Sequence, residues 1–77
     1  MFSYKKFGEA VCQGRQNRRM TIAQLADATD KSISFITHVE QGNRKISLET
    51  AKEICDVLQI SLERACNLAL SDPSTQH

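Results

Sequence analysis

Five hydroxyl residues divide this chain, and each one stands immediately before a stretch of apolar residues spaced three or four positions apart. A serine or threonine in that place accepts a hydrogen bond from a free backbone N–H group in the first turn of a helix, and so marks where the helix begins. Apolar residues three and four apart line one face of a helix, whereas a strand requires alternation. The hydroxyl residues are Ser3, Thr21, Ser32, Ser47 and Ser61. The pattern predicts five short helices and no strand.

The sequence also indicates the ends of some of these helices. Thr21 and Gln24 have the spacing of a capping box, in which each side chain bonds the other residue's backbone N–H. That helix runs to about Ala28 or Thr29, and the next is closed by Gly42, because glycine adopts the left-handed conformation easily. The apolar residues that share one face of each helix are, helix by helix, Tyr4, Phe7, Val11 and Cys12; Ile22, Leu25 and Ala26; Phe35, Ile36 and Val39, which point inward; Leu48, Ala51, Ile54, Cys55 and Leu58, which form a buried face; and Leu62, Ala65, Cys66 and Ala69.

A chain of 77 residues suits a single domain. The fold class expected is all-α, a compact five-helix domain over residues 1–70, followed by a disordered tail over residues 71–77. Gly8 lies on the apolar face of the first helix, where a missing side chain permits close helix packing. Gly14 weakens the same helix by about 1 kcal/mol relative to alanine, without an evident benefit.

The three cysteines argue against a disulfide framework or a metal site. They are odd in number and lack the C-x-x-C spacing of zinc and redox motifs. We interpret Cys12, Cys55 and Cys66 as reduced structural thiols, which suits the cytoplasm. No apolar run approaches the ~18 residues of a membrane span, and the N-terminus does not resemble a signal peptide. No metal, other cofactor or membrane is therefore expected as a partner.

Positive charge is concentrated in two places, although the net charge is only +1. One cluster is Arg15-Gln16-Asn17-Arg18-Arg19 and the other is Asn43-Arg44-Lys45. Clusters of this kind bind phosphates, and they also occur as ordinary solvated surface. Charge alone leaves both interpretations open.

The second and third expected helices form a helix-turn-helix candidate, since about three residues join them and a glycine closes the second of the pair. Residues 7–66 resemble, without a gap, the lambda-repressor-like family, also called the Xre or Cro type. The most specific match is Glu40-x-Gly42, followed by a basic residue and a serine-capped helix. The other matching residues are Phe7-Gly8, Val11, Arg15, Met20-Thr21, Leu25-Ala26, Ser32, Ile36, Val39, Asn43-Arg44, Ser47-Leu48-Glu49-Thr50, Ile54, Leu58 and Ile60-Ser61-Leu62.

This resemblance implies that the third helix, roughly residues 32–41, lies in the major groove of DNA, where all four base pairs can be distinguished. Side chains at the start and on the outer face of such a helix reach the bases. At those positions stand Ile33, Ser34, Thr37 and His38. Ile33 could instead fold onto Phe35, and His38 could be an inert surface histidine.

The resemblance also implies phosphate contacts from helix termini and basic residues around the reading helix. The candidates are Asn17, Arg18, Arg19, Thr21, Gln24, Gln41, Asn43, Arg44 and Lys45. Asn43 and Arg44 come first, because their loop resembles the family's phosphate clamp. Arg15 and Glu40 match positions that form an ion pair between the first and third helices, so we expect a structural role for both.

Three departures from the family pattern bear on affinity. Gly14 replaces an apolar residue, and Ile22 replaces a glutamine that commonly contacts phosphate. Asp30-Lys31 replaces the glycine and the apolar residue of the turn. Aspartate tolerates the left-handed conformation better than most residues, and Lys31 has to extend its charge along the surface toward water.

Together these features indicate a sequence-specific DNA-binding transcriptional regulator of bacterial, phage or plasmid origin, a homodimeric repressor or controller protein. It would bind a roughly palindromic operator with half-sites about one helical turn apart. The expected dimer surface lies on the fifth helix and consists of Leu62, Ala65, Leu68, Ala69 and Leu70. The alternative is a protein-interaction module of the same fold, of the antitoxin or anti-repressor type, with weakened DNA binding. No catalytic arrangement of residues suggests an enzyme, and no small-molecule substrate is expected.

Overall fold

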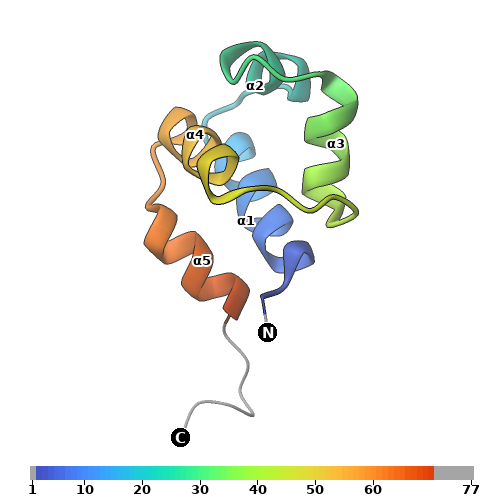
Figure 1. Cartoon of the computed structure of the whole chain (residues 1–77). Helices are drawn as coiled ribbons and strands as arrows, with labels where there is room; N and C mark the ends of the chain where they lie inside the picture. Colours follow the sequence, from blue (N-terminus) through green and yellow to red (C-terminus); the bar gives the residue numbers. More distant parts are fainter. Residues whose placement is uncertain (1, 71–77) are drawn as a thin grey trace, which may run out of the picture.

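The computed structural model describes the backbone of residues 2–70 and the side chains of residues 2–66, and this part of the chain folds into five α-helices (Figure 1). They are α1 (Tyr4–Asn17), α2 (Ile22–Ala28), α3 (Ile33–Gln41), α4 (Leu48–Leu58) and α5 (Leu62–Leu70). The all-helical fold predicted from the sequence is confirmed. The tail predicted over residues 71–77 lies outside the described residues.

Side-chain caps open the helices where the sequence predicts them. The serines before α1, α3 and α4 each accept a hydrogen bond from the backbone N–H three residues on. Ser61 accepts one from the N–H of Arg64 at 3.2 Å, and the capping box of Thr21 and Gln24 is formed in both directions. A side-chain cap contributes about 1 kcal/mol. Five caps therefore matter in a domain whose small size limits its core.

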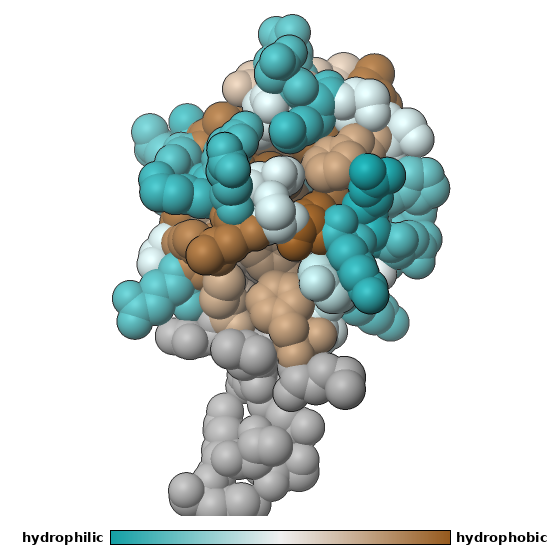
Figure 2. Space-filling view, in the orientation of Figure 1, coloured by the Kyte–Doolittle hydropathy of each residue, from teal (hydrophilic) through white to brown (hydrophobic). Residues whose placement is uncertain are grey.

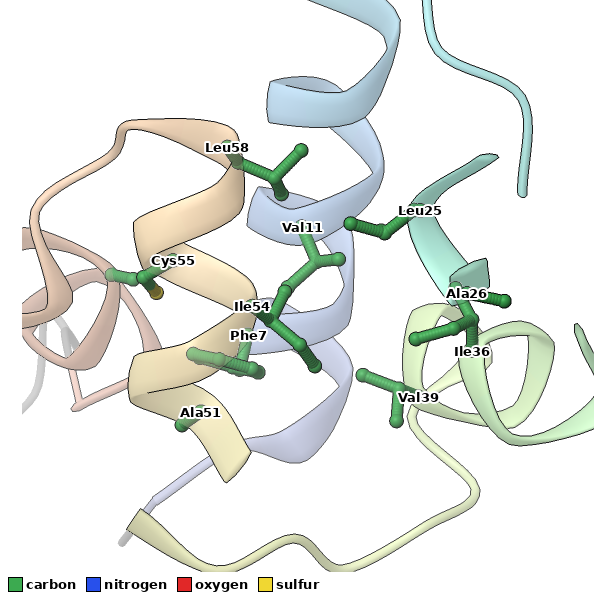
Figure 3. Packing of buried hydrophobic residues seen from close by; sticks show 11 residues of the cluster. Phe7, Val11, Leu25, Ala26, Ile36, Val39, Ala51, Ile54, Cys55 and Leu58 are labelled. Atoms are coloured by element: carbon green, nitrogen blue, oxygen red, sulfur yellow. The ribbon is translucent and has the colours of Figure 1, made fainter. Parts of the chain in front are cut away.

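α1 is the central helix of the bundle (Figure 1). It packs against α3, α4 and α5, while α2 packs against α3 and α4. Side chains from the first four helices converge between these elements (Figure 3), and α5 adds one more. The buried apolar residues are Phe7, Val11, Leu25, Ala26, Ile36, Val39, Ala51, Ile54, Cys55, Leu58 and Ala65.

The two glycines of α1 differ in the space around them. A Cβ at Gly8 would lie 2.7 Å from the backbone oxygen of Glu40 and closer still to that of Val39. The absence of a side chain therefore allows α1 and α3 to touch, as the sequence predicts. A Cβ at Gly14 would meet the side chain of Leu58 at 3.4 Å, an ordinary van der Waals contact.

Two apolar residues do not lie where the pattern predicts. Leu48, expected on the buried face of α4, is 70% exposed, because no other described helix covers the first turn of α4. Figure 2 shows apolar surface across the face on which α4 lies, bordered by hydrophilic residues. Ala65, expected on a dimer surface, is only 2% exposed, because it packs into the core of its own chain. The side chains of Leu68, Ala69 and Leu70 lie outside the described residues.

Candidate nucleic-acid interface

α3 lies at the edge of the bundle, with one face on α1 and α2 and the other uncovered in the described part of the chain (Figure 1). Ser32 fixes its start, because its Oγ accepts a hydrogen bond from the N–H of Phe35 at 2.9 Å. Gly42 fixes its end with a left-handed φ of 76°. A Cβ at Gly42 would lie 2.9 Å from the backbone nitrogen of Lys5, so the helix end also sits tightly against the start of α1. The outer face of α3 is therefore held in a defined position.

The four residues predicted to read bases lie on this outer face. Ile33 is 56% exposed, so more than half of its side chain is open to solvent. Ser34 and His38 are exposed, and Thr37 is half-buried. The hydroxyl of Thr37 donates to the carbonyl of Ile33 at 2.9 Å. Because its proton is used within the helix, Thr37 presents an acceptor and a methyl group outward, whereas Ser34 keeps both a donor and an acceptor.

The capping box at the start of α2 orients two of the predicted phosphate contacts. The N–H of Thr21 donates to Oε1 of Gln24 at 2.8 Å, and the N–H of Gln24 donates to Oγ1 of Thr21 at 3.0 Å. The box uses only the oxygen of the glutamine amide, so the two N–H donors of that amide remain outside it. Ile22, which replaces the glutamine usual in the family, packs partly against the core and makes a structural contribution instead.

The loop after α3 contains the second basic cluster, part of which contacts α3. The N–H of Asn43 donates to the carbonyl of His38 at 3.0 Å, and its side chain donates to Oε1 of Gln41 at 3.2 Å. The guanidinium of Arg44 lies over the ring of Phe35, 4.9 Å from its centroid. Lys45 is exposed. Asn43 is thus bonded to Gln41, and Arg44 lies against a ring of α3.

The residues of the first basic cluster, residues 15–19, do not all lie on the same side of the molecule. Asn17 follows Gly8 by nine residues, which is two and a half helical turns, so it points away from the side of α1 that touches α3. It lines a groove with residues of α5 and the loop before that helix. Arg18 is exposed and donates to Oε1 of Gln59 at 3.0 Å, and Arg19 has a left-handed φ of 55°. The structure therefore does not bring Asn17 to the reading helix.

Arg15 and Glu40 form a two-pronged ion pair that joins α1 to the end of α3. Nε of Arg15 lies 2.7 Å from one carboxylate oxygen, and Nη2 lies 3.1 Å from the other. Nη1 donates to the carbonyl of Met20 at 2.8 Å. The side chains are only 13% and 8% exposed. Hydrogen bonding to Glu40 raises the pKa of Arg15. Both charges therefore have partners inside the protein, and the pair ties α1 to the end of α3.

Two residues, one in α3 and one in the turn before it, were not predicted as part of this surface. Sequence reasoning assigned Phe35 to the core, but the residue is only half-buried at the edge of α3. Lys31 was noted as a departure in the turn, and its Nζ lies 6.0 Å from the centroid of Phe35. The available signal was the lysine itself, since it stands where an apolar residue is usual.

A metal site, a disulfide and a membrane-spanning helix each have requirements that the described residues do not meet. Between residues 2 and 66 no three His, Cys, Asp or Glu side chains are grouped in a way that could hold a metal ion. Cys12, Cys55 and Cys66 are free, and burial raises the pKa of Cys55 to about 11. No described helix is both long enough and apolar enough to cross a membrane.

Comparison with solved structures shows the same arrangement of helices in two regulators. The clp gene regulator ClgR from Corynebacterium glutamicum superposes with a TM-score of 0.83 and 23% identity, covering 91% of this chain and 74% of that chain. A second crystal structure of ClgR gives the same score and identity and is covered to 90%. The restriction-modification controller protein C.AhdI from Aeromonas hydrophila has a TM-score of 0.76 and 24% identity, covering 80% of this chain and 94% of that chain. These identities establish a shared fold.

No curated protein matches the sequence. Residues 13–64, more than half of the chain, match the helix-turn-helix family, and this segment contains α2, the turn and α3. The chain thus belongs to the helix-turn-helix family of the lambda-repressor-like type and is a DNA-binding transcriptional regulator.

Proposed function

We propose that this regulator is a homodimeric repressor or controller protein that inserts α3 into the major groove of a roughly palindromic operator. The observation that carries the proposal is the uncovered outer face of α3, on which Ile33 is 56% exposed beside the exposed Ser34 and His38. A large apolar side chain in water is unfavourable. It becomes favourable against the C5-methyl group of thymine, which the major groove displays.

The chemistry of this face predicts which base edges it prefers. Thr37 accepts hydrogen bonds outward, so it suits the N6 amino group of adenine or the N4 amino group of cytosine. Ser34 can donate or accept and discriminates less. No arginine or glutamine stands among the four readers, so the bidentate pairs worth about 1–3 kcal/mol each are absent. We therefore expect specificity to be built from several modest contacts.

Phosphate contacts frame the reading helix at both ends in this proposal. Thr21 and Gln24 would bind the backbone on the side of α2, with Arg18 and Arg19 nearby in sequence. The loop after α3 would bind it at the other end, through Gln41, Asn43, Arg44 and Lys45. Arg44 is the strongest candidate, because it is exposed and because contact with an aromatic ring does not use the N–H donors of a guanidinium.

A second copy of the chain is the expected partner, because two half-sites one helical turn apart require two reading helices. Leu62 is the remaining expected interface residue with a described side chain, and it is half-buried. The similarity in fold to a restriction-modification controller protein supports a role of the controller type. Sedimentation of the complex with a selected operator should give two protomers per duplex, whereas one protomer per duplex would contradict the dimer.

The deciding experiment is selection of bound sequences from random duplex DNA, followed by fluorescence anisotropy on the selected and mixed sequences. Arg44→Ala should weaken binding to all sequences alike and lower the salt slope by about 0.9. His38→Ala should change the preference among sequences. Lys52→Ala is the matched control, because this lysine lies on α4 and is paired with Asp56 at 2.9 Å.

Two outcomes would contradict the proposal. Loss of binding in Lys52→Ala together with unchanged binding in Arg44→Ala would show that the docking orientation is wrong. Absence of binding to any duplex at low salt would favour the alternative, a protein-interaction module of the antitoxin or anti-repressor type.

A further inference from the structure

Two positive charges lie near one aromatic ring of α3, that of Phe35. Nζ of Lys31 is 6.0 Å and Cζ of Arg44 is 4.9 Å from the centroid of Phe35. A cation within about 6 Å of a ring centroid is attracted by the quadrupole of the ring, so Arg44 is well within this range and Lys31 is at its limit. The cations come from different segments, because Lys31 belongs to the turn before α3 and Arg44 to the loop after it. The ring therefore brings together charges from both ends of the reading helix.

Neither cation is neutralised by the described part of the chain. The ion pairs among residues 2–66 are Arg15–Glu40 and Lys52–Asp56. The guanidinium of Arg15 donates hydrogen bonds to a carboxylate and to a backbone carbonyl. Arg44, by contrast, is exposed and its guanidinium lies over an aromatic ring. An aromatic face attracts a guanidinium without using up its in-plane N–H donors. Arg44 thus combines a fixed position with free hydrogen-bonding capacity.

The backbone around Lys31 fixes the root of its side chain. Asp30 adopts a left-handed φ of 57°, and the N–H of Lys31 then donates to the carbonyl of Ala26 at 2.8 Å. Lys31 is half-buried, so its apolar stem lies along the protein and its ammonium group emerges beside Phe35. A lysine held in this way loses less side-chain freedom on binding an anion than a freely solvated lysine does.

We propose that Lys31, Phe35 and Arg44 form one phosphate-binding site on the flank of α3, in which the two cations contact the DNA backbone and Phe35 positions them. The inference rests on the proposed function, since it supplies the ligand. The two cationic centres cannot be further apart than the sum of their distances to the ring centroid. This upper limit is compatible with contacts to neighbouring phosphates of one strand, which rise by about 3.4 Å along the helix axis.

The contribution of Lys31 can be measured with the full chain and a mixed-sequence duplex, by fluorescence anisotropy over a series of salt concentrations. Lys31→Met keeps an apolar stem and removes the charge, so it should weaken binding several-fold at low salt and lower the salt slope by about 0.9. Lys52→Met removes the same charge from the surface of α4 and should leave the slope unchanged. A slope for Lys31→Met equal to that of the wild type would overturn the site.

The positioning role of Phe35 has its own test. Phe35→Tyr keeps a ring and should bind mixed DNA as the wild type does, whereas Phe35→Leu keeps apolar bulk and should bind several-fold more weakly. Arg44→Ala should then cost less affinity in the Phe35→Leu background than in the wild type, because the ring no longer holds the guanidinium. Strictly additive losses would reduce Phe35 to a packing residue and overturn its positioning role.

These experiments distinguish a failure of the proposed phosphate site from a failure of the proposed DNA-binding function. Absence of duplex binding by the wild-type protein would overturn the proposed function and this site with it. Wild-type binding that is insensitive to Lys31→Met would overturn this site alone.

Discussion

Replacing Gly14 with alanine should stabilise the domain. Glycine inside a helix costs about 1 kcal/mol relative to alanine, and a new methyl group would meet Leu58 at 3.4 Å and Ile60 at 3.5 Å. The same position lines a groove of about 420 Å³ between α1 and the start of α5, so the methyl group fits there at ordinary van der Waals distances. Its partial burial adds at most about 0.8 kcal/mol. The expected gain is therefore about 1–2 kcal/mol in the free energy of unfolding.

Gly8→Ala is the matched control, because it makes the same chemical change in the same helix. The gain in helix propensity is equal, but the new Cβ would lie 2.7 Å from the backbone oxygen of Glu40. Backbone atoms of a packed helix can shift only at a cost in free energy. Overpacking of this kind destabilises a domain by about 1–3 kcal/mol or more. Gly8→Ala should therefore destabilise the domain, and it should also displace α3.

Thermal denaturation followed by circular dichroism distinguishes the two variants. In a domain of this size 1 kcal/mol shifts Tm by roughly 4–8 °C. We expect the Tm of Gly14→Ala to lie above that of the wild type and the Tm of Gly8→Ala to lie below it. If both variants shift in the same direction, or if Gly14→Ala lowers Tm, the argument from local space is refuted.

Glu40→Ala should destabilise the domain by about 3 kcal/mol in urea denaturation, since it leaves the largely buried charge of Arg15 without its carboxylate partner; a negligible loss would show that water replaces the carboxylate. Gln59→Gly should raise Tm by the equivalent of up to ~1 kcal/mol, because Gln59 holds a left-handed φ of 56° at the end of α4; a lower Tm would mean that its hydrogen bond to Arg18 matters more. Burial raises the pKa of Cys55 from 9.0 to about 11. The native state then keeps a proton that the unfolded chain loses, so stability should fall between these pH values by up to ~1.4 kcal/mol per pH unit relative to Cys55→Ala. Equal pH slopes for the two proteins would contradict this.

The helices could be predicted because their signals are local. A cap such as Ser32 requires only its own hydroxyl and an N–H three residues away, and the capping box of Thr21 requires only Gln24. Gly8 could be interpreted as a packing position because it interrupts an apolar face. None of these inferences needs the position of a distant residue.

The features that the sequence did not predict depend on how the helices are placed relative to one another. Leu48 continues the apolar spacing of α4, yet the core ends before it. Ala65 was expected to face a partner, yet α5 turns it toward the core. The ring of Phe35 faces charges from two loops, and periodicity within α3 contains no information about loops. The candidate site was therefore predictable as a helix face, but not as a set of contacts around that face.

The separation of residue types around α3 has a consequence for how this domain can evolve. None of the four outward residues of the reading face is a lysine, arginine, aspartate or glutamate, whereas Lys31 and Arg44 lie beside the helix on the ring of Phe35. Binding energy that depends on salt comes from the neutralisation of phosphates, and discrimination comes from the base edges. In the proposed complex the two contributions therefore come from different residues. We expect substitutions at Ser34 or His38 to change the preferred operator without loss of general affinity, and substitutions at Lys31 or Arg44 to change affinity without changing the operator.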